Sequence, residues 1–200
     1  MTKKELLLAT TNPGKINELK SHLTRLSFQI LSLRDLDLDM VYPETGRTFM
    51  ENARGKGLFY SQHCEYLTLA EDSGLVIDHL DGAPGVFSSR FAGPKATDEE
   101  NLQKALFLLE GLPWEKRSAR FVSSMVLCEK GNIIKEIEEK VEGFITTKKR
   151  GSGGFGYDPI FFYPPLNKTF AELIPEEKNV VSHRGRALTR LSSFLMESLK

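Results

Sequence analysis

The chain is poor in the residues that mark several specialised classes of protein. Its 200 residues include 2 cysteines, Cys64 and Cys128, and 1 tryptophan. Two thiols so widely separated lack the spacing of a zinc site or a redox pair, so we expect free cysteines in a reducing compartment. Neither sign of charge is in excess, because 27 Lys and Arg residues balance 27 Asp and Glu residues. A protein that grips the nucleic-acid backbone needs a basic excess, so no nucleic-acid partner is expected.

No segment has the form of a membrane or export signal. The apolar run Leu6-Leu7-Leu8-Ala9 is too short for a signal-peptide core or a spanning helix. The sequence therefore predicts no membrane partner and a cytoplasmic location. Hydrophobic residues at 40% and charged residues at 27% are ordinary for a globular chain. The length predicts one domain over residues 1–200, or two small lobes that share a core.

The order of predicted elements indicates an α/β architecture. A Leu-rich strand over 5–10 is followed by a helix over 13–26, with apolar residues at helical spacing, and by a strand over 28–33. Capping-box spacings at Thr48 and Thr97 predict two further helices. The remaining expectations are strands over 66–70 and 75–78 separated by an acidic turn, a loop over 82–94, a strand over 119–129, a hairpin turn at 131–132, a loop over 147–156 and a helix from about Ser182. Periodicity alone leaves residues 133–141 open between strand and helix, and the preceding turn favours strand.

The segment Thr10–Lys15 lies where the first strand meets the first helix. Such a junction offers free backbone N–H groups and the positive end of a helix dipole to an anion. Gly14 allows close approach, and Lys15 adds a full charge. The segment is not a Walker A loop, because Lys15 is followed by Ile16 rather than Ser or Thr. The alternative is an ordinary helix cap.

Two further segments carry chemistry only in combination with the first. The carboxylates of Glu71 and Asp72, in the expected acidic turn, are ligands that Mg²⁺ accepts, although a turn with a local side-chain hydrogen bond is the plainer alternative. Glu44 is by the same reasoning a lone exposed acid. After a glycine-rich run, the ring of Phe155 could stack on a base and Asp158 could meet its polar edge, or Phe155 could be a core aromatic.

Taken together and in this order, the segments resemble the inosine triphosphate pyrophosphatase family, the Ham1-like pyrophosphatases of deaminated purine nucleotides. The resemblance covers nearly the whole chain. The matching segments are Thr10–Lys15, Glu44-Thr45-Gly46, Glu51-Asn52-Ala53, Glu71–Leu75, Gly82-Ala83-Pro84-Gly85, Ser89-Arg90, Gly153–Pro159 and Ser182–Gly185.

The resemblance implies both a fold and a reaction. The fold is a long, mixed, twisted sheet flanked by helices in two lobes, with the active site in the cleft between them, and family members are usually homodimers. The reaction is Mg²⁺-dependent hydrolysis of ITP, dITP and XTP to the monophosphate and pyrophosphate, which cleanses the nucleotide pool. Direct attack by water is the economical mechanism, since no cysteine or serine has a visible triad partner.

The resemblance also assigns roles to individual residues. Asp72 is the catalytic carboxylate, and Glu44 and Asp72 are the metal ligands, although Pro43 occupies a neighbouring position that is often acidic in relatives. Apart from the resemblance, the donor and acceptor pattern of the purines suggests that Arg184 near O6, with a backbone or carboxylate acceptor from the Tyr157–Asp158 segment near N1, would reject adenine, because donors would face donors. The substrate-binding residues are Thr10, Thr11, Asn12, Pro13, Gly14, Lys15, Ser73, Phe155, Gly156, Tyr157, Asp158, Lys178, His183 and Arg184.

Two other classes of function remain open at this point. One is a pyrophosphatase for other modified nucleotides on the same scaffold. The other is a nucleotide-binding module without turnover, which the presence of Lys15, Asp72 and Lys178 disfavours. The products formed from ITP and Mg²⁺ distinguish all three.

Overall fold

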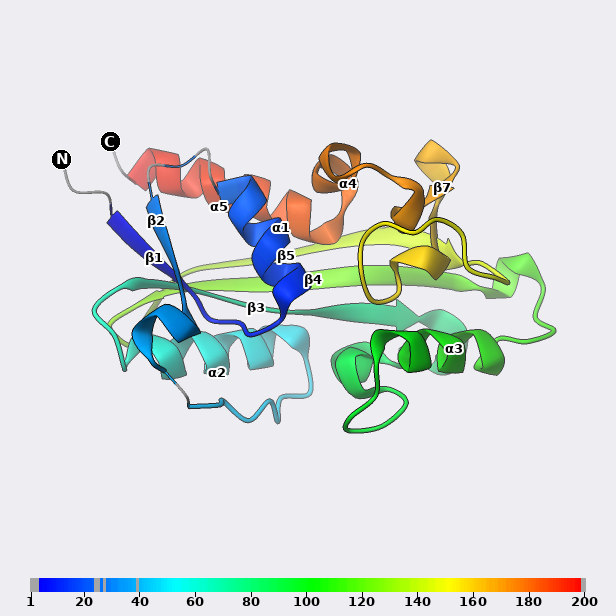
Figure 1. Ribbon diagram of the computed structural model, residues 1–200, viewed down its shortest axis with the longest axis horizontal. Coiled ribbons are helices and arrows are strands. Elements are labelled where there is room, and N and C mark those ends of the chain that lie inside the picture. The colour runs from blue at the N-terminus through cyan, green and yellow to red at the C-terminus, as the bar shows by residue number, and fades with distance from the viewer. Residues whose placement is uncertain (1–3, 24–25, 27, 39, 199–200) are drawn as a thin grey trace. The chain divides into compact units, whose positions relative to one another are not determined.

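The computed structural model describes residues 4–23, 26, 28–38 and 40–198, in which strands and α-helices alternate over residues 4–129 and are followed by three more strands and two helices (Figure 1). The strands are β1 (Lys4–Leu8), β2 (Phe28–Ser32), β3 (Leu67–Ile77), β4 (Ser118–Glu129), β5 (Asn132–Ile145), β6 (Phe161–Tyr163) and β7 (Lys168–Thr169). The helices are α1 (Pro13–Leu23), α2 (Phe49–Ser61), α3 (Asp98–Leu108), α4 (Pro175–Val181) and α5 (His183–Ser198).

These strands form one seven-stranded sheet in the order β2-β1-β3-β4-β5-β6-β7. Strand β1 pairs in parallel with both β2 and β3, whereas β6 pairs antiparallel with β5 and β7. The sheet is therefore mixed, with helices on its faces, and the predicted α/β class is confirmed.

Contacts between Cα atoms divide the chain into two compact units. The first unit comprises Met1–Asp72, Ser123–Glu139 and Arg184–Lys200, and the second comprises Ser73–Val122 and Lys140–His183. Strands β3, β4 and β5 contribute residues to both units. The chain passes from one unit to the other four times, at Asp72–Ser73, Val122–Ser123, Glu139–Lys140 and His183–Arg184.

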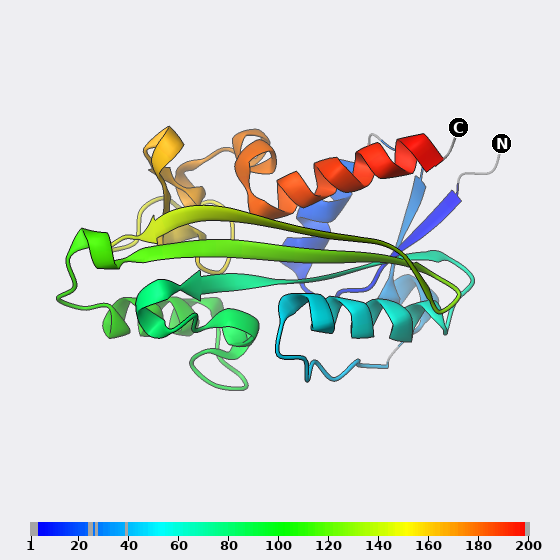
Figure 2. The same cartoon turned by 180° about the vertical axis from the view of Figure 1, so that it is seen from behind.

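The first unit buries β1 together with α5. Helices α1 and α5 lie on one face of the sheet in this unit, and α2 lies on the other (Figures 1 and 2). Leu6 and Leu8 alternate with Leu7, as the period of a strand requires, so each face of β1 contributes to a different apolar cluster. The cluster on the α5 side includes Leu6, Leu8, Leu19, Leu69, Met125, Leu127, Ala187, Leu188, Leu191 and Leu195.

The second unit is centred on aromatic rings. The ring of Phe121 lies 4.6 Å from that of Phe161, which lies 4.9 Å from that of Phe170. Arg117 is only 2% exposed, and its guanidinium donates hydrogen bonds of 2.6–2.7 Å to the carbonyls of Leu109, Ile145 and Thr146. The buried cation is thus satisfied by backbone oxygens at the ends of α3 and β5.

The predicted helix starts are confirmed. Thr48 accepts a hydrogen bond from the Glu51 amide at 3.1 Å, immediately before α2. Thr97 and Glu100 form a reciprocal capping box before α3, with bonds of 3.2 and 2.7 Å. Helix α1 ends at Leu23, and residues 24 and 25, which the prediction included, lie outside the described residues. The hairpin turn and the strand over 132–145 are also confirmed, whereas α4 was not predicted.

The predicted acidic turn at Glu71–Gly74 is wrong, because β3 runs without interruption from Leu67 to Ile77. Two adjacent carboxylates disfavour a buried strand on their own. Here both side chains are buried and both have polar partners, so the expected cost of burial is offset. Because side chains alternate along a strand, Glu71 and Asp72 point to opposite faces of the sheet.

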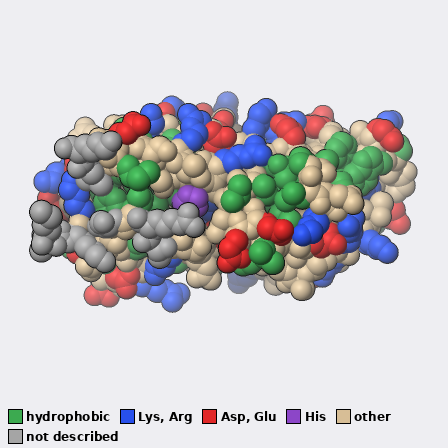
Figure 3. Space-filling view, turned by 90° about the horizontal axis from the view of Figure 1, so that it is seen from above, with side chains coloured by type: hydrophobic (Ala, Val, Ile, Leu, Met, Phe, Trp, Pro, Cys, Tyr) green, Lys and Arg blue, Asp and Glu red, His purple; other side chains and the backbone are tan. Residues whose placement is uncertain are grey.

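The surface carries no large region of one sign on the face seen in Figure 3, among the side chains that the figure colours by type. Basic and acidic side chains lie interspersed there with apolar ones. Among the helices within the described ranges, none is both long enough and apolar enough to cross a membrane.

Candidate active site

The segment Thr10–Lys15 connects β1 to α1, as predicted. The Asn12 side chain accepts a hydrogen bond from the Lys15 amide at 3.0 Å, and Thr10 Oγ1 accepts one from the Asn12 amide at 3.2 Å. Pro13 is the first residue of α1, a position where a missing N–H costs nothing. Burial lowers the pKa of Lys15, and the nearby charge of Glu71 opposes that shift. The segment therefore presents a helix N-terminus with a cation one turn in.

Glu71 lies at the centre of a buried ionic network in the first unit. Its carboxylate accepts hydrogen bonds from Arg184 Nε at 2.9 and 3.0 Å and from Ser123 Oγ at 2.8 Å. Burial alone would raise the pKa of Glu71, but the charges of Arg184 and Lys15 hold it well below its usual value. Glu71 is therefore a permanent anion within the unit.

Asp72 lies on the opposite face of β3, where it is 6% exposed. Asn52 Nδ2, from α2, donates a hydrogen bond of 2.9 Å to its carboxylate. Burial raises the pKa of Asp72, the charges of Lys15 and Lys56 oppose that shift, and the charge of Glu44 adds to it. A carboxylate whose pKa is raised by burial is suited to accepting a proton.

Lys56 connects Glu44, one of the two predicted metal ligands, to the backbone of β3 beside Asp72, the other. Its ammonium group forms a salt bridge with Glu44 and donates a hydrogen bond of 3.2 Å to the Glu71 carbonyl. Among the residues that the structure describes, no group of three or more His, Cys, Asp or Glu side chains is arranged to hold a metal ion. Two carboxylates close enough for Glu44 to raise the pKa of Asp72 nevertheless fit Mg²⁺, which takes its remaining ligands from water and phosphate oxygens.

Arg184, the predicted reader of the purine O6, is the second residue of α5 and is 3% exposed. Besides its bonds to Glu71, its Nη1 forms an ion pair with Glu18 of α1. The pKa of Arg184 is raised: burial alone would lower it, but the charges of Glu71 and Glu18 outweigh that effect. The structure thus fixes the guanidinium plane from two sides.

In the second unit, Phe155, Asp158 and Lys178 come together. Asp158 and Lys178 form a buried salt bridge, and the ammonium nitrogen of Lys178 lies 5.1 Å from the centroid of the Phe155 ring. The Asp158 carboxylate also accepts a hydrogen bond from the Phe155 amide at 2.8 Å. The predicted aromatic, acid and cation are therefore neighbours, although 20 residues separate Asp158 from Lys178.

Two other predicted site residues are buried in the second unit. The Tyr157 hydroxyl donates a hydrogen bond of 2.8 Å to the Ser88 carbonyl, so a ligand contact by Tyr157 would come from its backbone. The imidazole of His183 stacks on Phe121, with ring centroids 4.7 Å apart and planes inclined by 9°. Ser73 is partly buried on β3.

Sequence reasoning gave no role to several residues of these groups. Asn52 and Lys56 are buried polar side chains four positions apart on α2, a spacing that places them on one helix face and that could have drawn attention to them. Glu18 and Ser123 gave no such signal, because each owes its importance to a partner distant in the sequence.

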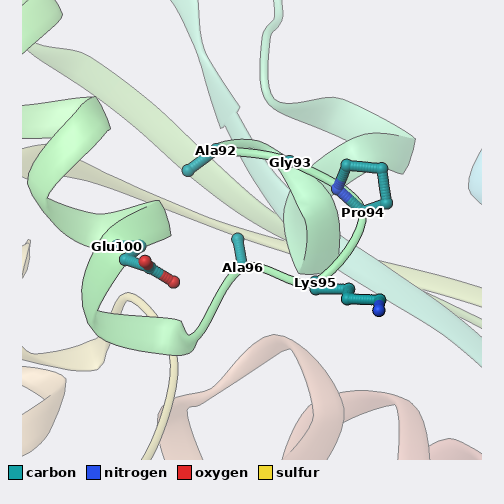
Figure 4. Close-up of a pocket in the computed structure, with 6 residues that line it drawn as sticks. All are labelled: Ala92, Gly93, Pro94, Lys95, Ala96 and Glu100. Carbon is teal, nitrogen blue, oxygen red and sulfur yellow. The ribbon is translucent and has the colours of Figure 1, made fainter.

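One surface depression of about 530 Å³ lies in the second unit (Figure 4). It is lined by Ala92, Gly93, Pro94, Lys95, Ala96 and Glu100. None of the predicted site residues lines it, and most of its lining is small side chains and backbone. The charged groups described above, rather than this depression, mark the candidate active site.

The comparisons with known proteins all point in one direction. Residues 6–194 match the sequence model of the Ham1 family. A protein of Halalkalibacterium halodurans named dITP/XTP pyrophosphatase is 45% identical over 192 residues, which cover 96% of this chain and 99% of that protein. A Bacillus subtilis protein of the same name is 43% identical, with coverage of 96% and 97%.

Solved structures agree with the sequence comparisons. The structure of a HAM1 protein from Coxiella burnetii superposes with a TM-score of 0.86 at 42% identity, covering 97% of this chain and 99% of that one. The Staphylococcus aureus Ham1 protein gives the same TM-score at 37% identity, covering 98% of this chain and 100% of that one.

Proposed function

The chain belongs to the Ham1 family, and from that premise we propose that it hydrolyses ITP, dITP and XTP to the nucleoside monophosphate and pyrophosphate. Relatives 43–45% identical to it are named for dITP and XTP. The observation that carries the proposal is the position of Asp72. It is a buried carboxylate under the charges of Lys15, Lys56 and Glu44, so a proton acceptor, a second carboxylate and two cations occur at one place.

The segment Thr10–Lys15 binds the triphosphate in this proposal. The Gly14 amide, the positive end of the α1 dipole and the Lys15 ammonium complement phosphate charge. The hydrogen bond from the Lys15 amide to Asn12 holds the first turn in shape, so the turn does not have to reorganise when the anion arrives. Because Lys15 is buried, little water competes for its ammonium group, and its attraction to the phosphate charge is stronger than it would be at an exposed position.

Glu44 and Asp72 hold a Mg²⁺ ion in this proposal. When bound, the ion would share the negative charge of the triphosphate, which the lysines alone do not neutralise. Lys56 orients Glu44 through their salt bridge, and Asn52 orients Asp72 through its amide. These two contacts, from one face of α2, fix the carboxylates before any ligand binds.

Asp72 orients the attacking water and accepts its proton late in the reaction. The raised pKa of Asp72 favours that transfer, whereas a bound cation would favour the ionised carboxylate. The pyrophosphate leaves from the side of Thr10–Lys15, where its charge is already complemented.

The base is held by the second group of residues. The Phe155 ring supplies a stacking face for a purine. Hypoxanthine and xanthine present an oxygen acceptor at position 6, whereas adenine presents an amino donor there. Arg184, of the first unit, would donate to that oxygen in this proposal and so favour the oxo purines, and an adenine would leave donors facing donors. The Asp158 carboxylate already accepts bonds from Phe155 and Lys178, and the Tyr157 carbonyl accepts bonds from the Ile160 and Phe161 amides, so the carbonyl of Asp158 is the better candidate for the N1 acceptor.

The deciding experiment is incubation of the purified protein with ITP and Mg²⁺, followed by separation of the products. IMP and pyrophosphate are expected. IDP and orthophosphate would indicate an ordinary phosphatase, and binding without products would indicate a module without turnover. Faster release of pyrophosphate from a modified pyrimidine nucleotide than from ITP would indicate that modified pyrimidine nucleotides, rather than deaminated purine nucleotides, are the substrates. An excess of chelator is expected to abolish turnover while the circular dichroism spectrum stays unchanged.

We further propose that the protein acts in the cytoplasm as a homodimer. Both statements extend the family resemblance, and neither is needed for the chemistry. A monomeric mass at micromolar concentration would remove the dimer without affecting the rest of the proposal.

A further inference from the structure

The segment Phe155–Asp158 forms a tight turn. The Phe155 amide donates to the Asp158 carboxylate at 2.8 Å, and the Asp158 amide donates to the Phe155 carbonyl at 3.2 Å. Gly156, inside the turn, has φ +60°, and a Cβ there would meet nothing within 4 Å. Glycine is therefore present for its backbone freedom rather than to make room.

A carboxylate from a distant part of the second unit holds this turn. The amide of Gly156 donates a hydrogen bond of 3.0 Å to Asp98 Oδ2, across 58 residues of sequence. Asp98 is the first residue of α3, directly after the cap residue Thr97. The next residue along the turn, Tyr157, is tied to Ser88 through its hydroxyl. Both contacts connect the turn to residues 88–98.

The Asp98 contact is exposed, and this determines what it can do. If the carboxylate were removed, the Gly156 amide could bond to water, so the folded state would lose little free energy. The turn would lose one restraint on its orientation, however, and the neighbouring ring of Phe155 would sample more positions. The free-energy cost of ordering the Phe155 ring would then be paid on binding a ligand that stacks on it, so binding would be weaker.

We propose that Asp98 is a positioning residue for the base-binding segment: its carboxylate holds the Gly156 amide and thereby presets the ring of Phe155. The proposal rests on the proposed function, because it assigns the base to Phe155. Asp98 touches neither the triphosphate residues nor the proposed metal ligands in any contact described above.

The chain offers a matched control in Glu99. It is the next residue of α3, it is also an exposed acid of the first turn, and it also contacts the loop before Phe155, through the Lys149 ammonium at 2.7 Å. Glu99→Ala removes the same charge from the same helix end without touching the Gly156 amide. Asp98→Asn removes the charge and keeps one oxygen acceptor for the Gly156 amide, with an NH2 group in place of the other oxygen.

The test compares Asp98→Ala, Asp98→Asn and Glu99→Ala in steady-state hydrolysis of ITP, with inorganic tripolyphosphate as a competitive inhibitor that has no base. Asp98→Ala is expected to raise KM for ITP about 3- to 10-fold with kcat within about twofold, as for loss of one hydrogen bond. The inhibition constant of tripolyphosphate is expected to stay unchanged. Asp98→Asn should recover most of the KM, and Glu99→Ala should match the parent protein.

A second readout does not depend on activity. Hydrogen exchange of the Gly156 amide, followed by NMR, should be faster in Asp98→Ala and close to the parent rate in Asp98→Asn. An unchanged KM and exchange rate in Asp98→Ala would overturn the proposal, and so would a parallel weakening of tripolyphosphate. If the parent protein leaves ITP intact, the proposed function fails first and this inference fails with it.

Discussion

Glu71 and Arg184 form the most completely buried ion pair described here, with Arg184 Nε 2.9 and 3.0 Å from the two carboxylate oxygens and side chains 1% and 3% exposed. The pair joins the middle of β3 to the start of α5, across 113 residues of sequence. Because Asp72 follows Glu71 on β3, the pair also fixes the strand from which the proposed catalytic carboxylate projects.

Breaking this pair is expected to destabilise the protein. Arg184→Ala would leave the buried Glu71 anion with only the charge of Lys15 and the Ser123 hydroxyl, and should lower the free energy of unfolding by about 3–5 kcal/mol. Urea denaturation measures this quantity. The double variant Glu71→Gln, Arg184→Met is the control and should regain much of the loss. A single variant as stable as the parent would show that the pair contributes nothing.

The same pair predicts a pH dependence of stability. The charges of Arg184 and Lys15 hold the pKa of Glu71 below its ordinary 4.5, although burial opposes them. A group whose pKa is lower in the folded state stabilises it fully above the unfolded pKa and loses that contribution as the pH falls. The stability difference between the parent and Glu71→Gln, measured by urea denaturation, should therefore shrink between about pH 5 and pH 3. A constant difference across that range would contradict the assignment.

Replacing Asp72 should separate activity from stability. Asp72→Asn is expected to lower kcat by orders of magnitude, because the proton acceptor and a metal ligand are lost. In chelator near neutral pH the variant should be more stable than the parent, since burial raises the pKa of Asp72 and ionisation therefore costs more in the folded state. That gain should be lost as the pH falls through the raised pKa of the folded state towards the ordinary pKa of 3.8, below which the carboxyl is protonated in both states. Asn52→Ala, which removes only the partner, is the control for packing, and near-normal turnover by Asp72→Asn would refute the catalytic role.

Substitutions of Phe155 and of Arg184 should affect the preference among purine nucleotides in different ways. Phe155→Ala is expected to weaken use of ITP and GTP about equally, because stacking does not distinguish purines. Arg184→Lys keeps the charge that Glu71 and Glu18 require but loses the planar fork, and should reduce the preference for ITP over ATP about tenfold. The ratio of kcat/KM values measures both effects. A common decrease on every nucleotide would make Arg184 a phosphate-binding or structural residue.

Two glycines of the loop before Asp158 form a matched pair. Gly154 and Gly156 both have positive φ, +70° and +60°, but a Cβ at Gly154 would lie 2.0 Å from Asp158 Oδ2. Gly156→Ala should cost only the backbone strain, about 1–2 kcal/mol. Gly154→Ala should cost more and should raise KM for ITP further, because it displaces the carboxylate that holds Lys178. Equal melting temperatures and equal KM values would contradict this reasoning.

Local signals in the sequence were sufficient for much of the fold. Thr48 and Thr97 begin helices because each has an acid three residues later, and the junction at Thr10–Lys15 follows from a strand, a cap and a proline in succession. The same local reasoning failed at Glu71 and Asp72. Their carboxylates occur within a strand because Ser123, Arg184 and Asn52 meet them from distant segments.

In the candidate site, too, local sequence signals could not reveal contacts between residues distant in the sequence. The grouping of Phe155 with Lys178 came from the resemblance, and no spacing along the chain could have produced it. Lys56 went unassigned because its partner Glu44 lies in an irregular segment before α2. Arg117 offers no signal in the sequence, since its partners are backbone carbonyls.

The apolar cluster that joins β1 to α5 has a consequence for synthesis on the ribosome. Leu6 and Leu8 are synthesised long before Leu188 and Leu191, which belong to the same apolar cluster. A nascent chain that ends before α5 therefore exposes one face of β1 and also lacks Arg184, the counterion of Glu71. Contacts of such long sequence separation form slowly. Folding of the first unit therefore cannot be completed until α5 has been made, and a chaperone that shields the β1 face during that interval would act on this protein before any nucleotide does.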